Sequence, residues 1–174
     1  MAAQFLFDLS TIDLDAMAVP PDEVGRINPQ AGHMRHLDHV IWMARDYSQS
    51  LGVKRVRHDE FWVAGHIPGR PLMPGVLMIE AGAQLASVAY RHRTRNNQFM
   101  AFTHIDNAVF RCQVVPGNTL YLLAQERKFQ PRRFICDIQG VVNDALAFEA
   151  TISGMIVGET RQRNAGAPAG ASMA

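Results

Sequence analysis

A histidine and a glutamate stand 14 positions apart in the segment FWVAGHIPGRPLMPGVLMIEAGAQ. His66 lies in a stretch rich in Gly and Pro, and a neutral imidazole can remove a proton from carbon. Glu80 follows in an apolar run, where poor solvation favours the protonated carboxyl that can donate a proton. The pair therefore predicts a base and an acid within one short segment.

The residues between this pair predict the start of a helix. Pro74 and Gly75 precede a long apolar run, and the first N–H groups of a helix carry a partial positive charge. Such N–H groups can stabilise a developing oxyanion or enolate. A base, an acid and an oxyanion site suit proton removal next to a carbonyl with loss of a leaving group. Each feature alone has an ordinary structural explanation, such as an ion pair of Glu80 with Arg70, but their combination favours a catalytic site.

One helix and several strands must position these groups. Residues 76–90 are apolar on almost every side, which indicates a buried helix, with Glu80, Gln84 and Ser87 on one stripe. Strand-like segments surround this helix in the chain, at residues 39–46, 51–57, 99–111, 119–129, 132–142 and 146–157. The expected fold class is α+β, an antiparallel sheet wrapped around one long central helix. Because such a sheet keeps open edges and an apolar face, we expect at least a dimer.

The composition excludes several classes of protein. The chain has 174 residues, 48% of them apolar and 19% charged, and a formal net charge of +1. These values predict one globular domain and exclude a generally basic nucleic-acid binder. We expect an N-terminal arm at 1–30, the domain at 31–160 and a disordered tail at 161–174. Cys112 and Cys136 form neither a disulfide framework nor a zinc site, and a cytoplasmic location is expected because no signal peptide or membrane segment is evident.

The segment from Gly65 to Gln84 resembles a known family. It reads G-H-I-P-G-R-P-L-M-P-G-V-L-M-I-E-A-G-A-Q, and the FabZ-type (3R)-hydroxyacyl-acyl-carrier-protein dehydratases of fatty acid synthesis have the pattern G-H-F-P-G-x-P-x-M-P-G-V-L-x-x-E-A-x-A-Q. Weaker similarity covers residues 33–157 and includes the block A-V-F-R-C-Q-V-V-P-G-N-T-L.

The resemblance implies a hotdog fold, with dimers that often assemble as a trimer of dimers. It implies a site between protomers, with His66 from one and Glu80 from the other. In that family the histidine removes the C2 proton of the acyl thioester, and the glutamate helps to expel the C3 hydroxyl as water. By the same resemblance, the N–H of Gly75 polarises the thioester carbonyl and Gln84 orients Glu80. No cofactor is needed for this elimination.

Departures from the family pattern leave the substrate open. Ile67 replaces the Phe after the histidine, Gly82 and Asn118 replace commoner residues, and the upstream P-F-L-L-V-D-R-V stands as H-M-R-H-L-D-H-V. We expect the acyl tunnel to involve Ile67, Pro68, Met73 and Val76. The pathway is fatty acid synthesis or a specialised lipid or polyketide pathway. The alternatives are a hotdog acyl thioesterase and a non-catalytic acyl-thioester-binding protein.

Two further groups of residues each allow two interpretations. Five arginines form a possible basic patch that either caps the helix or docks an acidic acyl carrier protein bearing 3-hydroxyacyl-phosphopantetheine, namely Arg91, Arg93, Arg95, Arg132 and Arg133. His33, His36 and His39 recur every third residue, and a partly exposed face without metal is favoured over a metal site.

Overall fold

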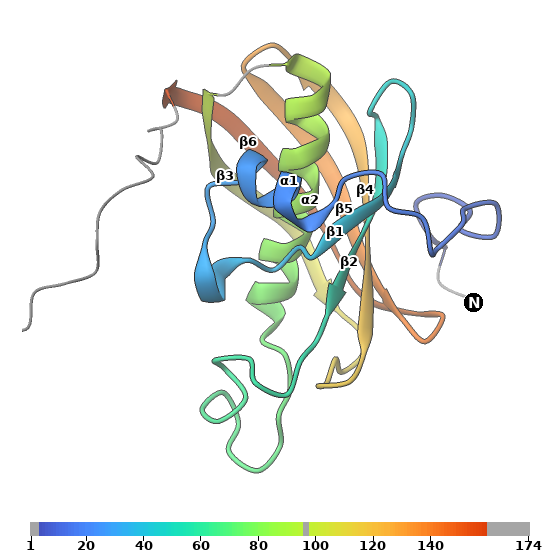
Figure 1. Ribbon diagram of the computed structural model, residues 1–174, viewed down its shortest axis with the longest axis vertical. Coiled ribbons are helices and arrows are strands. Elements are labelled where there is room, and N and C mark those ends of the chain that lie inside the picture. The colour runs from blue at the N-terminus through green and yellow to red at the C-terminus, as the bar shows by residue number, and fades with distance from the viewer. Residues whose placement is uncertain (1–3, 96–97, 160–174) are drawn as a thin grey trace, which may run out of the picture.

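The computed structural model describes residues 4–95 and 98–159, which form one curved antiparallel sheet around a central helix (Figure 1). The strand order is β1-β2-β4-β5-β6-β3. The strands are β1 (His39–Met43), β2 (Gln49–Arg55), β3 (Gln98–Phe110), β4 (Thr119–Gln130), β5 (Arg133–Val142) and β6 (Ala145–Glu159). The helices are α1 (Pro21–Ile27), the short 3-10 helix η1 (Gly32–Met34) and α2 (Gly75–Thr94). The sheet wrapped around one long helix is confirmed.

Helix α2 follows from its sequence at both ends. It begins after Pro74 and ends at Thr94. The next residue, Arg95, has a left-handed backbone (φ 53°), and its N–H donates to the carbonyl of Arg91. Basic residues in the last turn suit the negative end of the helix dipole. The apolar run predicts a helix that ends at residue 90. The structure extends the helix by one more turn, which the apolar pattern does not indicate because residues 91–94 are polar. Most of its buried residues pack on the inner face of the sheet, against β2, β4 and β5.

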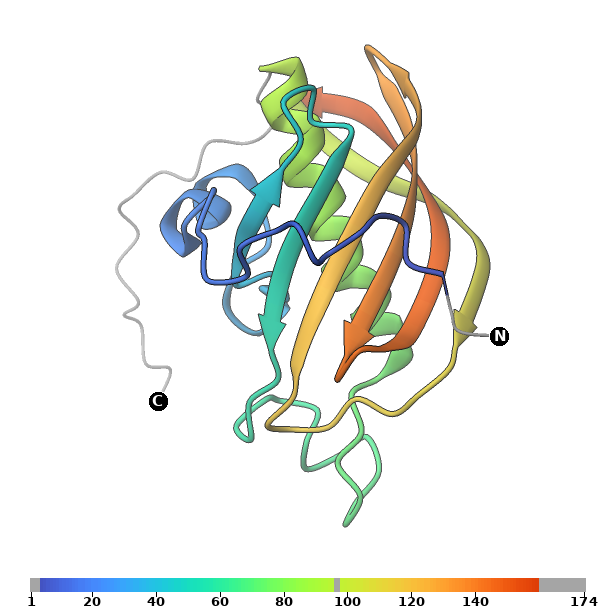
Figure 2. The same cartoon turned by 90° about the vertical axis from the view of Figure 1, so that its right-hand side faces the viewer.

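The N-terminal arm packs on the outer face of the sheet (Figure 2). Its first part crosses the strands, where the Leu6 N–H donates to Oε1 of Gln139 at 2.9 Å and the ring of Phe7 lies 5.7 Å from that of Trp42. Val19 then forms a β-bridge with the edge strand β1. The arm therefore covers part of the outer face and contacts one edge of the sheet. The predicted tail at 161–174 lies outside the described residues.

The other edge of the sheet, β3, is open and apolar. Its large exposed side chains are Phe99, Phe102, Ile105, Val109 and Phe110. An uncovered apolar edge strand of this length favours pairing with another chain, in line with the expected dimer.

Other expectations have simpler outcomes. Cys112 is exposed, Cys136 is buried, and both are free thiols. Among the described residues, no helix is both long and apolar enough to cross a membrane.

Gly82 allows α2 to lie close to β5. A Cβ atom at this position would stand 2.7 Å from Cδ1 and 3.2 Å from Cβ of Ile138, a side chain that is fully buried. The departure from the family pattern at position 82 is therefore matched to a bulky, β-branched neighbour on the sheet.

We expect Gly82→Ala to lower the free energy of unfolding by about 1–3 kcal/mol, because overpacking outweighs a gain of about 1 kcal/mol in helix propensity. Chemical denaturation measures the change. The double variant Gly82→Ala/Ile138→Val should recover part of the loss. A more stable single variant would show that the helix and sheet have room to separate.

Candidate active site

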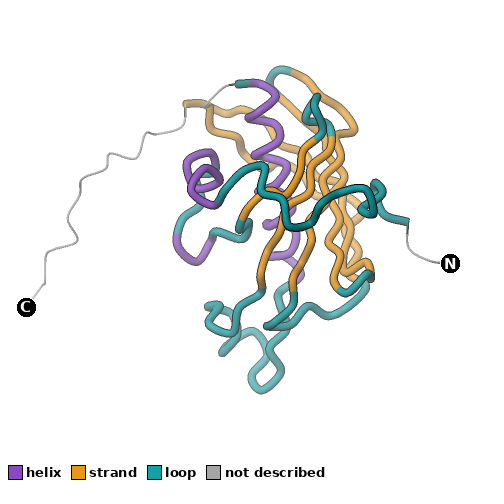
Figure 3. Tube along the Cα trace, turned by 45° about the vertical axis from the view of Figure 1, so that its right-hand side comes forward, coloured by secondary structure: helices purple, strands orange, loops and turns teal. Residues whose placement is uncertain are grey.

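The loop between β2 and α2, residues 56–74, extends away from the sheet (Figure 3). This loop contains His66. The N–H of His66 donates to the carbonyl of Trp62 at 2.9 Å. Nδ1 of the exposed imidazole lies 2.8 Å from the carbonyl oxygen of Leu72. Because a carbonyl can only accept, this contact places the ring proton on Nδ1 of the neutral imidazole. Nε2 then keeps the lone pair that a general base needs.

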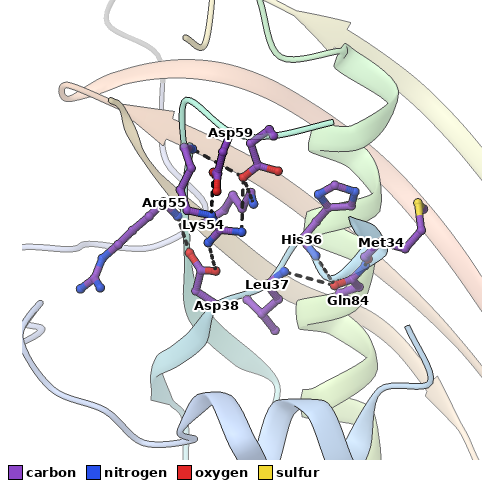
Figure 4. A network of polar contacts seen from close by, with 10 residues as sticks. Met34, His36, Leu37, Asp38, Lys54, Arg55, Asp59 and Gln84 are labelled. Carbon is purple, nitrogen blue, oxygen red and sulfur yellow. Dashed lines mark hydrogen bonds and ion pairs between the residues drawn. The ribbon is translucent and has the colours of Figure 1, made fainter. Parts of the chain in front are cut away.

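Two interactions fix the ends of this loop. The N–H of Met73 donates to the carbonyl of Val114 at 2.8 Å. At the other end, the fully buried ammonium of Lys54 pairs with Glu60 at 2.5 Å. Lys54 is part of the network shown in Figure 4. A buried ion pair with good geometry resists loss of either partner, so the base of the loop is held firmly.

The start of α2 offers a backbone amide that the hydrogen bonds of the helix do not use. The N–H groups of Leu77 and Met78 both donate to the carbonyl of Pro74, so the N–H of Gly75 precedes the first hydrogen bond of the helix. A Cβ at position 75 would lie 2.6 Å from Cε1 of Phe110. Glycine therefore allows the end of β3 to approach the helix start.

The Glu80 carboxyl is half-buried, and one of its oxygens is held by two amides. Oε1 accepts from Nε2 of Gln84 at 2.8 Å and from Nε2 of Gln30 at 3.0 Å. Sequence reasoning selects Gln84 but misses Gln30, because nothing in the pattern of residues 28–32 links them to position 80.

Gln84 also joins α2 to the segment before β1 (Figure 4). Its Oε1 accepts from the N–H groups of His36 and Leu37 at 2.9 and 3.1 Å. Its Nε2 donates to the carbonyl of Met34 at 2.7 Å as well as to Glu80. The partners of Oε1 are both donors and the partners of Nε2 are both acceptors, so the Gln84 amide fits in only one orientation.

Glu80 lines a cavity of about 280 Å³ that follows α2. The wall along the helix continues through Ser87 to Arg91, and apolar rings from the strands form much of the remainder. The full lining is Pro29, Gln30, Glu80, Ala83, Ser87, Arg91, Phe99, Met100, Ala101, Phe102, Phe134 and Gly154. His66 is not part of this lining, so the cavity holds the predicted acid without the predicted base.

The residues predicted for the acyl tunnel lie elsewhere. Met73 is buried in the core, whereas Ile67, Pro68 and Val76 are exposed. None of the four lines the Glu80 cavity of the same chain.

The predicted basic patch needs one correction. Arg91 is only 6% exposed and lines the cavity, so it does not belong to an exposed docking face. Arg93 pairs with Glu126 and stacks over the ring of Phe129. The exposed members are Arg95, Arg132 and Arg133.

The three spaced histidines do not share a face. His33 is exposed in η1, whereas His36 and His39 are 0% and 7% exposed, so the expectation of a partly exposed histidine face is wrong for two of them. Their segment bends into the core and then into β1 instead of forming a regular helix. No cluster of His, Cys, Asp or Glu in residues 4–95 and 98–159 could hold a metal ion.

Comparison with known proteins shows the family of this chain. A family model described as a FabA-like domain matches residues 28–151. The chain belongs to this FabA-like family. The chain is 35% identical over 140 residues to 3-hydroxyacyl-[acyl-carrier-protein] dehydratase FabZ of Agrobacterium fabrum, covering 79% of this chain and 89% of that protein. Identity to the FabZ of Rhodospirillum rubrum is 37% over 132 residues, covering 72% and 80%.

A solved structure shares the fold of this FabA-like chain. The dehydratase heterocomplex ApeI:P from Xenorhabdus doucetiae matches with a TM-score of 0.66 and 14% identity, covering 77% of this chain and 90% of that one. The hotdog fold and the FabZ-type resemblance are therefore confirmed.

His36 distinguishes this chain from the FabZ pattern, which has Leu at that position. Both ring nitrogens are buried without a hydrogen-bond partner in the described part of the chain. Burial, followed by the positive charge of Lys54, lowers the pKa of His36 to about 4, although Glu60 and Asp38 act in the opposite direction. The folded protein therefore keeps this imidazole neutral.

This burial predicts a loss of stability in acid. Because the folded pKa lies below the unfolded value of 6.5, the unfolded chain binds a proton first as the pH falls from 6.5 toward 4. Above pH 6.5, His36 is neutral in both states, so its titration does not lower the free energy of unfolding. Near pH 4, protonation of His36 in the unfolded chain should lower the free energy of unfolding by on the order of 3 kcal/mol. Denaturation curves between pH 7.5 and 4.5 measure the loss. His36→Leu should remove this component, and equal losses in both proteins would contradict the assignment.

Proposed function

We propose that this protein dehydrates (3R)-3-hydroxyacyl thioesters to trans-2-enoyl thioesters, with acyl carrier protein as the carrier. The observation that carries the proposal is the Glu80 carboxyl, held by two amides on the wall of an apolar cavity. The two FabZ relatives reported above, of which the chain covers 89% and 80%, support the reaction class.

The elimination uses three groups of this chain. Nε2 of His66 takes the C2 proton, and the electrons of that C–H bond form the C2=C3 double bond. The C3–O bond breaks, and the Glu80 carboxyl gives its proton to the departing hydroxyl, which leaves as water. The N–H of Gly75 stabilises the negative charge that develops on the thioester oxygen. The chain itself supplies acid, base and oxyanion donor.

The complete site forms between two protomers. The cavity beside Glu80 lacks His66, and its outer wall is Phe99–Phe102 of the open edge strand β3. Pairing of two β3 strands would cover their apolar side chains and place a second chain next to each cavity. We propose that the partner contributes its His66 to this cavity and that the exposed loop residues Ile67 and Pro68 reach the acyl chain in the same way.

The acyl carrier protein would dock near the end of α2. Arg132 and Arg133 lie beside this end, because the hydroxyl of Tyr90 donates to the carbonyl of Pro131 in the turn before β5. Arg95 completes an exposed basic cluster at the end of the cavity that Arg91 lines. Complementary charge would guide the acidic carrier to this face.

We expect His66→Ala and Glu80→Gln each to lower the rate of crotonyl-thioester hydration by at least about 100-fold, because each removes one proton-transfer group. A spectrophotometric assay of the enoyl thioester measures the rate. Thermal unfolding and oligomeric state should remain unchanged in both variants. Turnover that survives either substitution would remove the role assigned to that residue.

A mixed dimer tests whether the site is shared. When His66→Ala and Glu80→Gln chains are co-expressed, one site of each mixed dimer has both groups intact if the two come from different protomers. We expect recovery to about a quarter of the wild-type rate for random pairing. Each variant expressed alone is the control. No recovery in purified mixed dimers would place both groups in one chain.

A further inference from the structure

Gln30 is a contact of Glu80 from a part of the chain outside the motif segment. It lies between α1 and η1, 50 positions before Glu80, and its Nε2 donates to Glu80 Oε1 at 3.0 Å. Gln30 and Glu80 line the same cavity. The N-terminal segment therefore reaches the candidate acid directly.

The two oxygens of the Glu80 carboxyl differ, because both amides donate to the same oxygen. An sp² oxygen has two lone pairs, and Nε2 of Gln30 and Nε2 of Gln84 occupy both lone pairs of Glu80 Oε1. In the neutral carboxyl the proton must then lie on Oε2. Within the described residues, Oε2 has no hydrogen-bond partner, so it is the oxygen available to a ligand in the cavity.

Gln84 and Gln30 differ in what else they bond. Gln84 also bonds three backbone groups of residues 34–37, so its removal would disturb the fold as well as Glu80. The Oε1 atom of Gln30 is buried and has no donor among the described residues. A buried acceptor without a donor lowers stability, which a side chain serving only the fold would not need.

We propose that Gln30 is a positioning residue of the proposed dehydration, which it presupposes. By holding Oε1, it keeps the proton on Oε2 and directs Oε2 at the departing C3 hydroxyl. Gln30 acts through Glu80. The arrangement lowers the stability of the protein, because Oε1 of Gln30 stays buried without a donor among the described residues.

Gln30→Met tests the proposal, because methionine keeps the length of the side chain and removes both polar atoms. We expect kcat for crotonyl-thioester hydration to fall about tenfold or more, because a hydrogen bond to a proton-donating group is lost. KM should change less than about threefold. The unfolding temperature should stay the same or rise. Gln30→His, which keeps an N–H donor of similar reach, should recover most of kcat.

Gln130→Met, at an exposed position at the end of β4, is the matched control and should change neither kcat nor stability. An unchanged kcat in Gln30→Met, or a fall in kcat that follows a loss of folded protein, would overturn the proposal. Inactive wild-type protein would instead overturn the proposed dehydration itself. Active wild-type protein with an unaffected Gln30→Met variant would overturn only the role of Gln30.

Discussion

The side-chain amide of Gln84 is the interaction on which the candidate site depends. It joins α2 to residues 34–37 through three backbone groups and uses its remaining donor on Glu80. A buried amide with every polar atom bonded cannot rotate without loss of several hydrogen bonds. The position of the acid is therefore set by the same contacts that hold the N-terminal segment against the helix.

The cavity of a single chain holds Glu80 without His66, and the surface of the sheet is consistent with the proposed sharing of the site. One edge of the sheet is covered by the arm through Val19, while β3 presents aromatic and aliphatic side chains along an open edge. The cavity beside Glu80 has this open strand as a wall. Pairing of two chains through β3 would then both bury the open edge and complete the proposed site. Activity would therefore depend on assembly.

Two buried polar residues lie near the candidate site, and the first of them departs from the FabZ pattern quoted above. His36 lies fully buried beside the Lys54–Glu60 ion pair, and its neutral form is favoured there. Arg91 brings a guanidinium to the wall of the cavity, where burial lowers its pKa. A buried guanidinium at this end of the cavity limits how a purely hydrocarbon chain can occupy it.

The sequence by itself determined the architecture and the family, and it selected His66, Glu80 and Gly75 as candidate catalytic groups. Apolar periodicity located α2 and the strands to within a few residues, because burial of an apolar face depends mainly on local pattern. The motif from Gly65 to Gln84, which includes the fixed spacing from His66 to Glu80, identified the family, because one loop and the first part of one helix carry the whole pattern. Tertiary structure alone decided that Gln30 reaches Glu80, that His36 is buried, that Arg91 lines the cavity and that Ile67 does not. These outcomes depend on contacts between residues far apart in the chain, and the packing of whole elements sets them.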